Sequence, residues 1–556
     1  MTEKATADDL LDNGTDLFNK GEWDSASDCY DKAKKIYEIL GDKQGISNTL
    51  IGLGNVYRNK CEWERTIEFY EKSLKISEEL RDKQGISNAL IGLGNVYQNR
   101  GEWEHAIEFY EKSLKIFEEL GGKQGISTTL GNLGNVYSNK GEWVRAIEFY
   151  EKSLKIFEEL GDKQGISNAL NNLGCVYQNR GEWERAIEFY EKSLKISEEL
   201  GDKQGISVTL GNFGDVYSNK GEWVRAIEFY EKSLKISEEL GDKQGISVTL
   251  VNIGELQIKN GNWDEAKKNL KKALEISEKL APILTVDVLA NLGELFRLEE
   301  QFSDAFTNLQ KAISIAVQVG LKPEEIDIYE KLGDTHLDQF VGHKIEDNLT
   351  LSEKFYYLAL KLAKSLNMPL QEATAIRGIG VVQAKKRDLA VSKKSFMNAI
   401  EILRRLGAHY ELQKTLLEYA KVLYETNVLV EAEMMAKTSA FDALRHDYRE
   451  LLVKLYLLLG DIEMRRENQY EYYLDALKTS EFNPKIYVRT CFTMIFRMKT
   501  MEKKTLLKFI GSLKEVNKNR DKYFDQFLEA LNAKIEGRKY KIADLPSSLE
   551  LEIKSF

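Results

Sequence analysis

Asparagines recur on one side of several predicted helices in the first half of the sequence. Asn88, Asn95 and Asn99, for example, stand at i, i+7 and i+11, which is one side of a helix. A carboxamide carries two N–H donors and a carbonyl acceptor, so a ladder of them could pair with the N–H and C=O groups of an extended peptide. The positions that share this pattern are Asn55, Asn88, Asn95, Asn99, Asn132, Asn135, Asn139, Asn168, Asn172, Asn179 and Asn212.

A polar stripe of this kind can also serve the fold itself. Asparagine is a poor helix former because its side chain competes for backbone hydrogen bonds, so several within one helix lower its stability. Binding of a peptide or protein is one reason to keep them. A structural ladder between neighbouring segments, or a solvated polar face, is another, and near-identical copies are not independent observations.

The sequence contains no constellation typical of catalysis or of a bound cofactor. It lacks the phosphate-binding, dinucleotide, metalloprotease and hydrolase-elbow signatures, so we predict neither an enzyme nor a cofactor. His336 and His343 stand seven residues apart, and incidental surface histidines account for them better than a metal site. The four cysteines form no C-x-x-C pair, which favours free thiols in a reducing cytoplasm.

Length and charge narrow the class of protein. The chain has 556 residues, so it holds either several globular domains or one repeat array. Its net charge of −10 argues against a general nucleic-acid binder, which normally carries a basic field. No apolar run approaches the ~18 residues of a membrane span, and the polar N-terminal segment does not resemble a signal peptide.

A 40-residue repeat organises the first half of the chain. All seven tryptophans keep this step, and so do the glycines from Gly14 to Gly254. The copies from about 41 to 240 are nearly identical, which indicates duplication of one unit. The tryptophans are Trp23, Trp63, Trp103, Trp143, Trp183, Trp223 and Trp263.

Each copy predicts two helices joined by a tight turn. In residues 81–120, Ile86, Leu93 and Tyr97 follow helical spacing, and Gly101 can end that helix in the left-handed conformation. A second apolar face begins at Trp103. Neither helix, at roughly 16 to 19 residues, can bury its apolar face alone, so the units must stack.

Small residues mark close contacts inside each unit. Gly94 and Ala106 lie on facing helices, and a larger side chain at either would force them apart. A helical glycine otherwise costs about 0.5–1 kcal/mol relative to alanine. We expect Trp103 and Tyr110 to fill the space towards the neighbouring unit.

The string LGNVYQNRGEWEHAIEFYEKSLKI, residues 93–116, resembles a tetratricopeptide repeat (TPR). Its 40-residue length and GDKQGIS linker are similar to the longer repeats of Pins-like polarity adaptors and kinesin light chains. The proline that often ends the 34-residue unit is absent, because all five prolines lie beyond residue 281. The resemblance implies an all-α, right-handed superhelical solenoid whose first helices line a concave groove, where asparagines hold bound peptide.

The repeat weakens along the chain. Residues 1–280 are predicted to form seven regular TPR repeats, and 281–484 about five divergent ones with an insertion near 337–351. Residues 485–541 hold 15 Lys/Arg against 6 Asp/Glu and are predicted to be basic capping helices, with a tail at 542–556. We therefore expect about twelve helix–turn–helix repeats and a C-terminal cap.

Several functional interpretations remain. A non-enzymatic adaptor or scaffold would hold an extended or helical segment of a protein partner in the groove. An RNA-binding solenoid would instead use the basic C-terminal helices, and a gel shift at ~50 mM salt would distinguish it. A sensor or regulatory subunit of a separate effector chain is a third, and the C-terminal half could also mediate self-association.

Overall fold

A computed structural model describes residues 3–466 except positions 260, 344 and 447, together with residues 471–480, 490 and 494. These described residues form 24 α-helices and no strand. The helices pair in chain order into twelve helix–turn–helix units, which confirms the predicted all-α solenoid. The capping helices predicted for 485–541 (residues 490 and 494 apart) and the tail at 542–556 lie outside the described residues.

The first helix of each unit contacts the second, and each second helix contacts the next first helix. The first helices are α1 (Glu3–Asn19), α3 (Lys43–Asn59), α5 (Lys83–Asn99), α7 (Lys123–Asn139), α9 (Lys163–Asn179), α11 (Lys203–Asn219), α13 (Lys243–Lys259), α15 (Pro282–Leu298), α17 (Lys322–His343), α19 (Pro369–Lys385), α21 (His409–Glu425) and α23 (Arg449–Arg466). The second helices are α2 (Trp23–Leu40), α4 (Trp63–Leu80), α6 (Trp103–Leu120), α8 (Trp143–Leu160), α10 (Trp183–Leu200), α12 (Trp223–Leu240), α14 (Trp263–Ser277), α16 (Phe302–Val319), α18 (Glu346–Ser365), α20 (Leu389–Leu406), α22 (Leu429–Arg445) and α24 (Glu471–Ser480).

Left-handed residues end the helices where the sequence predicts them. Gly101 has φ 71°, and the N–H of Glu102 donates to the carbonyl of Tyr97 at 2.8 Å, which closes the turn between α5 and α6. Cys61 (φ 58°) keeps this turn geometry without glycine, as do Glu300, Arg387 and Asn427 in later repeats. Arg81 (φ 54°) ends the second helix α4 in the same left-handed conformation, which L-residues normally avoid.

A buried tyrosine from the second helix of each of the first six repeats explains the repeat glycines, and Leu270 takes this place in the seventh. A Cβ atom added to Gly94 would lie 2.6 Å from Cε1 of Tyr110, so the ring occupies the space of the missing side chain. Tyr70 lies in the same way against Gly54 of its own repeat and Gly92 of the next. The prediction that the tyrosine fills the space towards the neighbouring unit is confirmed.

Two glycines of α7 test this packing on one helix. We expect Gly134→Ala to destabilise the protein by about 1–2 kcal/mol, because its Cβ would lie 2.7 Å from Cε1 of the buried Tyr150. Gly131→Ala would meet only the Ser153 hydroxyl at 3.8 Å, so the gain in helix propensity should stabilise the protein by up to about 1 kcal/mol. Urea unfolding followed by circular dichroism measures both, and shifts of the same sign would contradict this account.

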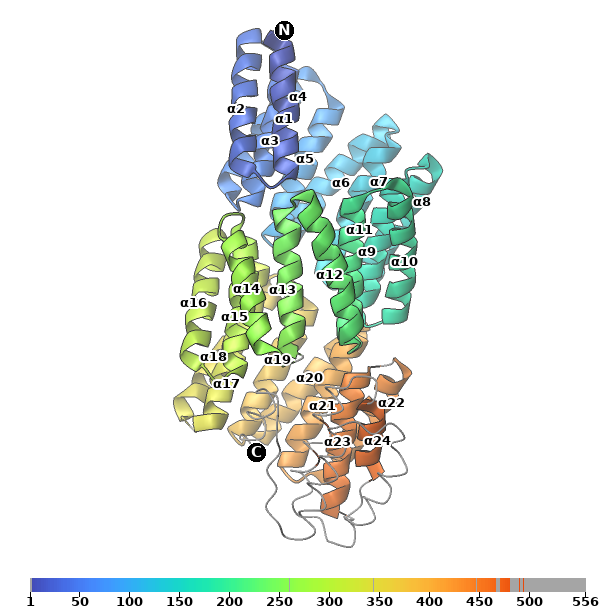
Figure 1. Cartoon of the computed structure of the whole chain (residues 1–556), viewed down its shortest axis with the longest axis vertical. Helices are drawn as coiled ribbons and strands as arrows, with labels where there is room; N and C mark the ends of the chain where they lie inside the picture. Colours follow the sequence, from blue (N-terminus) through green and yellow to red (C-terminus); the bar gives the residue numbers. More distant parts are fainter. Residues whose placement is uncertain are drawn as a thin grey trace.

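The solenoid winds far enough for its second superhelical turn to lie against its first. Figure 1 shows α1–α4 at one end of the long axis, α13–α16 below them, and α17–α24 towards the other end. Trp23 clusters with Ala281 and Leu284, and the indole Nε1 of Trp63 donates to the carbonyl of Val319. We call this contact, between the intra-repeat turns of repeats one to five and the loops that precede α15, α17, α19, α21 and α23, the seam.

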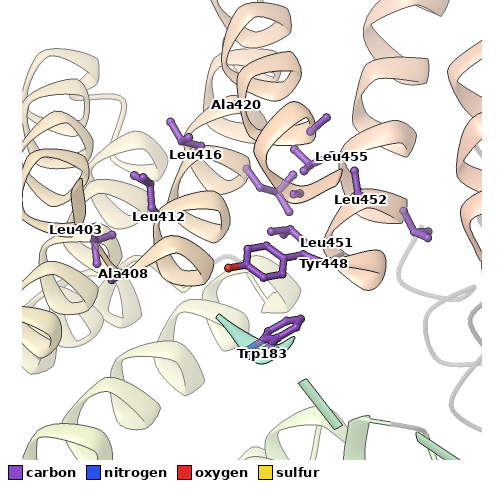
Figure 2. Packing of buried hydrophobic residues seen from close by; sticks show 14 of the residues in the cluster. Trp183, Leu403, Ala408, Leu412, Leu416, Ala420, Tyr448, Leu451, Leu452 and Leu455 are labelled. Carbon is purple, nitrogen blue, oxygen red and sulfur yellow. The ribbon is translucent and has the colours of Figure 1, made fainter. Parts of the chain in front are cut away.

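The tryptophans of repeats one to five begin their second helices next to the seam. Residues of the second superhelical turn bury them, in addition to residues of the adjacent repeats. Trp103 lies in a cluster with Leu366 and Met368 of the second superhelical turn. The prediction that it packs towards the next repeat therefore describes only part of its contacts. Figure 2 shows the Trp183 ring next to that of Tyr448. The two ring centroids are 4.5 Å apart, and the Tyr448 hydroxyl donates to the Gly181 carbonyl at 2.9 Å. The second turn thus covers indole rings that would lie at the open edge of a shorter array.

Candidate binding groove

The first helices form the inner wall of the solenoid. First helices of neighbouring units contact one another directly, as α3 does with α5, α9 with α11 and α17 with α19, which places them on the inside of the curve. The predicted asparagine stripe belongs to these helices. Its members stand at four positions along each first helix, at i, i+4, i+7 and i+11, and we call these positions levels.

The middle level is oriented by the core tyrosines. The hydroxyls of Tyr70, Tyr110 and Tyr150 donate to the side-chain carbonyls of Asn55, Asn95 and Asn135, at 2.8, 2.6 and 2.6 Å. All three asparagines are half-buried. Each bond fixes the carboxamide, so its two Nδ2–H donors are the part that remains for a further partner. We call these pairs the tyrosine clamps.

The level one turn earlier contains Asn132, Asn172 and Asn212, which are half-buried. Asn212 donates from Nδ2 to the side-chain carbonyl of Asn171 at 3.0 Å, across the boundary between two repeats. The structural-ladder interpretation therefore applies to Asn212. Asn132 and Asn172 lie one turn from the clamps on their own helices.

The two outer levels lie at the helix ends. Asn88 and Asn168 are exposed near the starts of α5 and α9, and each accepts a long hydrogen bond, 3.4 and 3.5 Å, from the glutamine four residues earlier. Asn99, Asn139 and Asn179 are the exposed last residues of α5, α7 and α9. These three line a cavity of about 360 Å³ at the seam.

The inner wall changes from amide to acid along the chain, a gradient that the asparagine pattern alone does not predict. The residue after the repeat glycine is Asn at 55, 95 and 135, then Cys175, Asp215, Glu255, Glu294 and Asp334. Two of these acids keep the tyrosine partner, since Tyr230 donates to Asp215 at 2.6 Å and Tyr356 donates to Asp334. Leu270 and Leu309 take its place in the repeats of Glu255 and Glu294. Reading the dipeptides Gly-Asp and Gly-Glu in phase with the repeat would have found this gradient.

Burial raises the pKa of some acids of the inner wall. It raises the pKa of Asp215 to about 6 and that of Glu330, one turn before Asp334, to about 7. Burial acts on Glu411 in the same direction, but the charges of Lys414 and Arg377 outweigh it and lower the pKa to about 2. Arg377 bonds Glu411 at 2.6 Å. The C-terminal half of the wall therefore holds buried ion pairs where the N-terminal half holds amides.

The residues near 337–351 extend a helical hairpin, because they form the end of α17 and the start of α18. His336 bonds Asn348 at 3.2 Å and lies between the rings of Phe306 and Phe355. Across the described part of the chain, no group of three His, Cys, Asp or Glu side chains is placed to hold a metal ion. Within the same residues, no helix is both long and apolar enough to cross a bilayer.

A tetratricopeptide repeat family model matches residues 7–79, 45–119, 125–199 and 205–279. The chain is a tetratricopeptide repeat protein. The matched segments coincide with the regular repeats that carry the tyrosine clamps. No curated protein matches this TPR protein in sequence.

Solved structures similar to this TPR protein include BtubC (BKLC) from P. vanneervenii, with 24% identity over 38% of this chain and 90% of that one, and a TM-score of 0.34. A Rap protein complexed with competence and sporulation factor has 15% identity, coverage of 65% and 99%, and a TM-score of 0.45. The apo quorum sensor NprR from B. thuringiensis has 19% identity, coverage of 63% and 99%, and a TM-score of 0.42.

Proposed function

We propose that this chain is a non-enzymatic cytoplasmic adaptor that holds an extended or helical segment of a partner polypeptide in its concave groove. The asparagines of the inner wall would bind the segment by its backbone. The partner is therefore a protein or peptide, with no cofactor.

The tyrosine clamps are the observation that carries this proposal. A carboxamide that serves only as a solvated surface needs no fixed orientation, yet Asn55, Asn95 and Asn135 each accept a short bond from a buried hydroxyl. Fixing a donor before binding reduces the side-chain entropy that the complex must lose. The clamps therefore support a role in recognition beyond polarity alone.

The spacing of the clamps also suits an extended chain. Packed helices lie about 10 Å apart, and one three-residue turn of an extended polyproline II segment spans about 9 Å. Every third backbone carbonyl of such a segment points the same way, so the clamps on α3, α5 and α7 could each donate to one of these carbonyls. The RNA-binding alternative rests on the basic residues 485–541, which lie outside the described residues apart from 490 and 494.

A triple variant tests the groove. We expect Asn95→Ala, Asn135→Ala and Asn172→Ala together to weaken binding of a partner captured from the native host by about a hundredfold, at about 1 kcal/mol per lost hydrogen bond. Isothermal titration calorimetry with the identified partner segment measures the change. Circular dichroism and the unfolding midpoint confirm that the fold is retained.

A double variant on the same helices serves as the matched control. Asn88→Ala with Asn168→Ala removes exposed carboxamides that lie away from the tyrosine clamps. We expect a loss of affinity less than about tenfold, because these side chains are not pre-oriented. Unchanged affinity in the triple variant would refute the groove assignment.

A further inference from the structure

A cavity lies where the inner wall meets the seam. It is about 360 Å³, within the range of small-ligand sites, and it is lined from both superhelical turns. The first turn contributes Asn99, Asn139 and Asn179 at the ends of three helices, with Trp103 and Trp143 from the turns that follow. The second turn contributes the starts of α17 and α19, including Glu324.

Two lining residues carry buried polar atoms without a partner. Trp103 is only 2% exposed, and its indole Nε1–H makes no hydrogen bond. One carboxylate oxygen of Glu324, Oε2, is also buried and unbonded. An unmet buried donor or acceptor costs about 1–3 kcal/mol, so this site has a donor and an acid that a ligand could satisfy.

Among the described residues that line the cavity, Glu324 is the one charged residue. Burial raises the pKa of Glu324 to about 7, and the charge of Asp327 on the same helix adds to the rise. Asp287 on α15 has its pKa raised to about 7 by burial, with Glu324 and Asp327 contributing. The neighbouring lysines are already engaged, since Lys322 pairs with Glu102 at 3.6 Å and Lys331 with Asp327.

We propose that this seam cavity binds an arginine side chain of the segment held in the groove, with Glu324 as the counter-ion and Trp103 as a donor to that residue's backbone carbonyl. The inference rests on the proposed function, because it places one side chain of the same bound segment. It adds a specificity element to a groove that otherwise recognises only the backbone.

Arginine fits the cavity better than other cations. Its planar guanidinium carries five donors, which can pair with one carboxylate and with one of the asparagine side-chain carbonyls that line the cavity. An ammonium group would fill fewer of these acceptors.

Fluorine NMR of the full chain labelled with 5-fluorotryptophan tests the proposal directly, because the chain has seven tryptophans and so seven signals. The probes are N-acetyl-arginine methylamide, its neutral citrulline analogue and its lysine analogue, each titrated to about 20 mM, since ligands of this size bind with a Kd of about 1 mM. Trp103→Phe and Trp143→Phe assign the two cavity signals. The remaining five signals serve as internal controls.

We expect the arginine probe to shift the Trp103 signal at concentrations about tenfold lower than the citrulline probe requires, with the lysine analogue between them. Glu324→Gln should abolish that difference, while the spectrum of the free variant still shows a folded protein. Glu325→Gln, at the next position of α17, should leave the difference unchanged. Equal shifts by arginine and citrulline, or shifts confined to other tryptophans, would overturn the proposal. Because the probes need no partner, this result is independent of the asparagine triple variant, which alone decides the groove.

Discussion

Trp183→Ala is expected to destabilise the protein by about 3–5 kcal/mol, the usual cost of removing a fully buried indole. Trp183 is 1% exposed and packs against Tyr410 and Tyr448, which lie more than 200 residues later in the chain. Removing the indole therefore eliminates contacts between the first and the second superhelical turn as well as contacts within its own repeat. Hydrogen–deuterium exchange should show faster exchange both in α9–α10 and at the starts of α21 and α23.

Trp263→Ala is the matched control for that prediction. Trp263 holds the same place in its repeat, but it is partly exposed and packs in a cluster drawn only from residues 234–298. We expect a cost of about 1–2 kcal/mol and faster exchange only in α13–α15. If both variants accelerated exchange only locally, the seam would not contribute to stability.

Asp215→Asn is expected to stabilise the protein at neutral pH, by about 3 kcal/mol at pH 7 and by only about 0.5 kcal/mol at pH 4. Burial raises the pKa of Asp215 from 3.8 to about 6, so the folded protein retains this proton over a range where the unfolded chain has lost it. Stability from this group therefore falls as pH rises from about 4 to about 6. Asparagine, which the sister repeats carry at 55, 95 and 135, does not ionise.

The reverse change provides the control for the pH dependence. Asn135→Asp places an acid beside Tyr150 in the same setting and should destabilise the protein increasingly above pH 4. Thermal unfolding of both variants at pH 4, 5, 6 and 7, each referred to the unchanged protein, gives the two opposite slopes. A stability difference independent of pH in either variant would refute the buried ionisation of this position.

The sequence predicts most of the local structure, because short-range chemistry determines it. Gly101 marks the turn, Tyr110 and Gly94 mark the contact of two helices, and the 40-residue step sets the array. These features depend on residues within one or two repeats. The helix pairs and the tyrosine packing therefore follow from pattern alone.

The seam could not be predicted in the same way. The pairing of Trp63 with Val319 spans 256 residues and depends on the sum of small rotations between units, which no local pattern encodes. The cavity at the seam was missed for the same reason, since Asn139 and Glu324 meet only after a full superhelical turn. The tyrosine clamps, by contrast, were within reach, because their partners are fixed 15 residues apart.

The seam also limits how this gene can change. Near-identical copies allow a 40-residue unit to be gained or lost by unequal recombination, and an open solenoid tolerates such changes in length. Here Asn367 donates a hydrogen bond to Glu104 and Tyr448 donates one to Gly181, across 263 and 267 residues of chain. One repeat more or fewer between these partners would pair every seam residue with the wrong repeat. We therefore expect the number of copies to be held constant by selection even where their individual sequences drift.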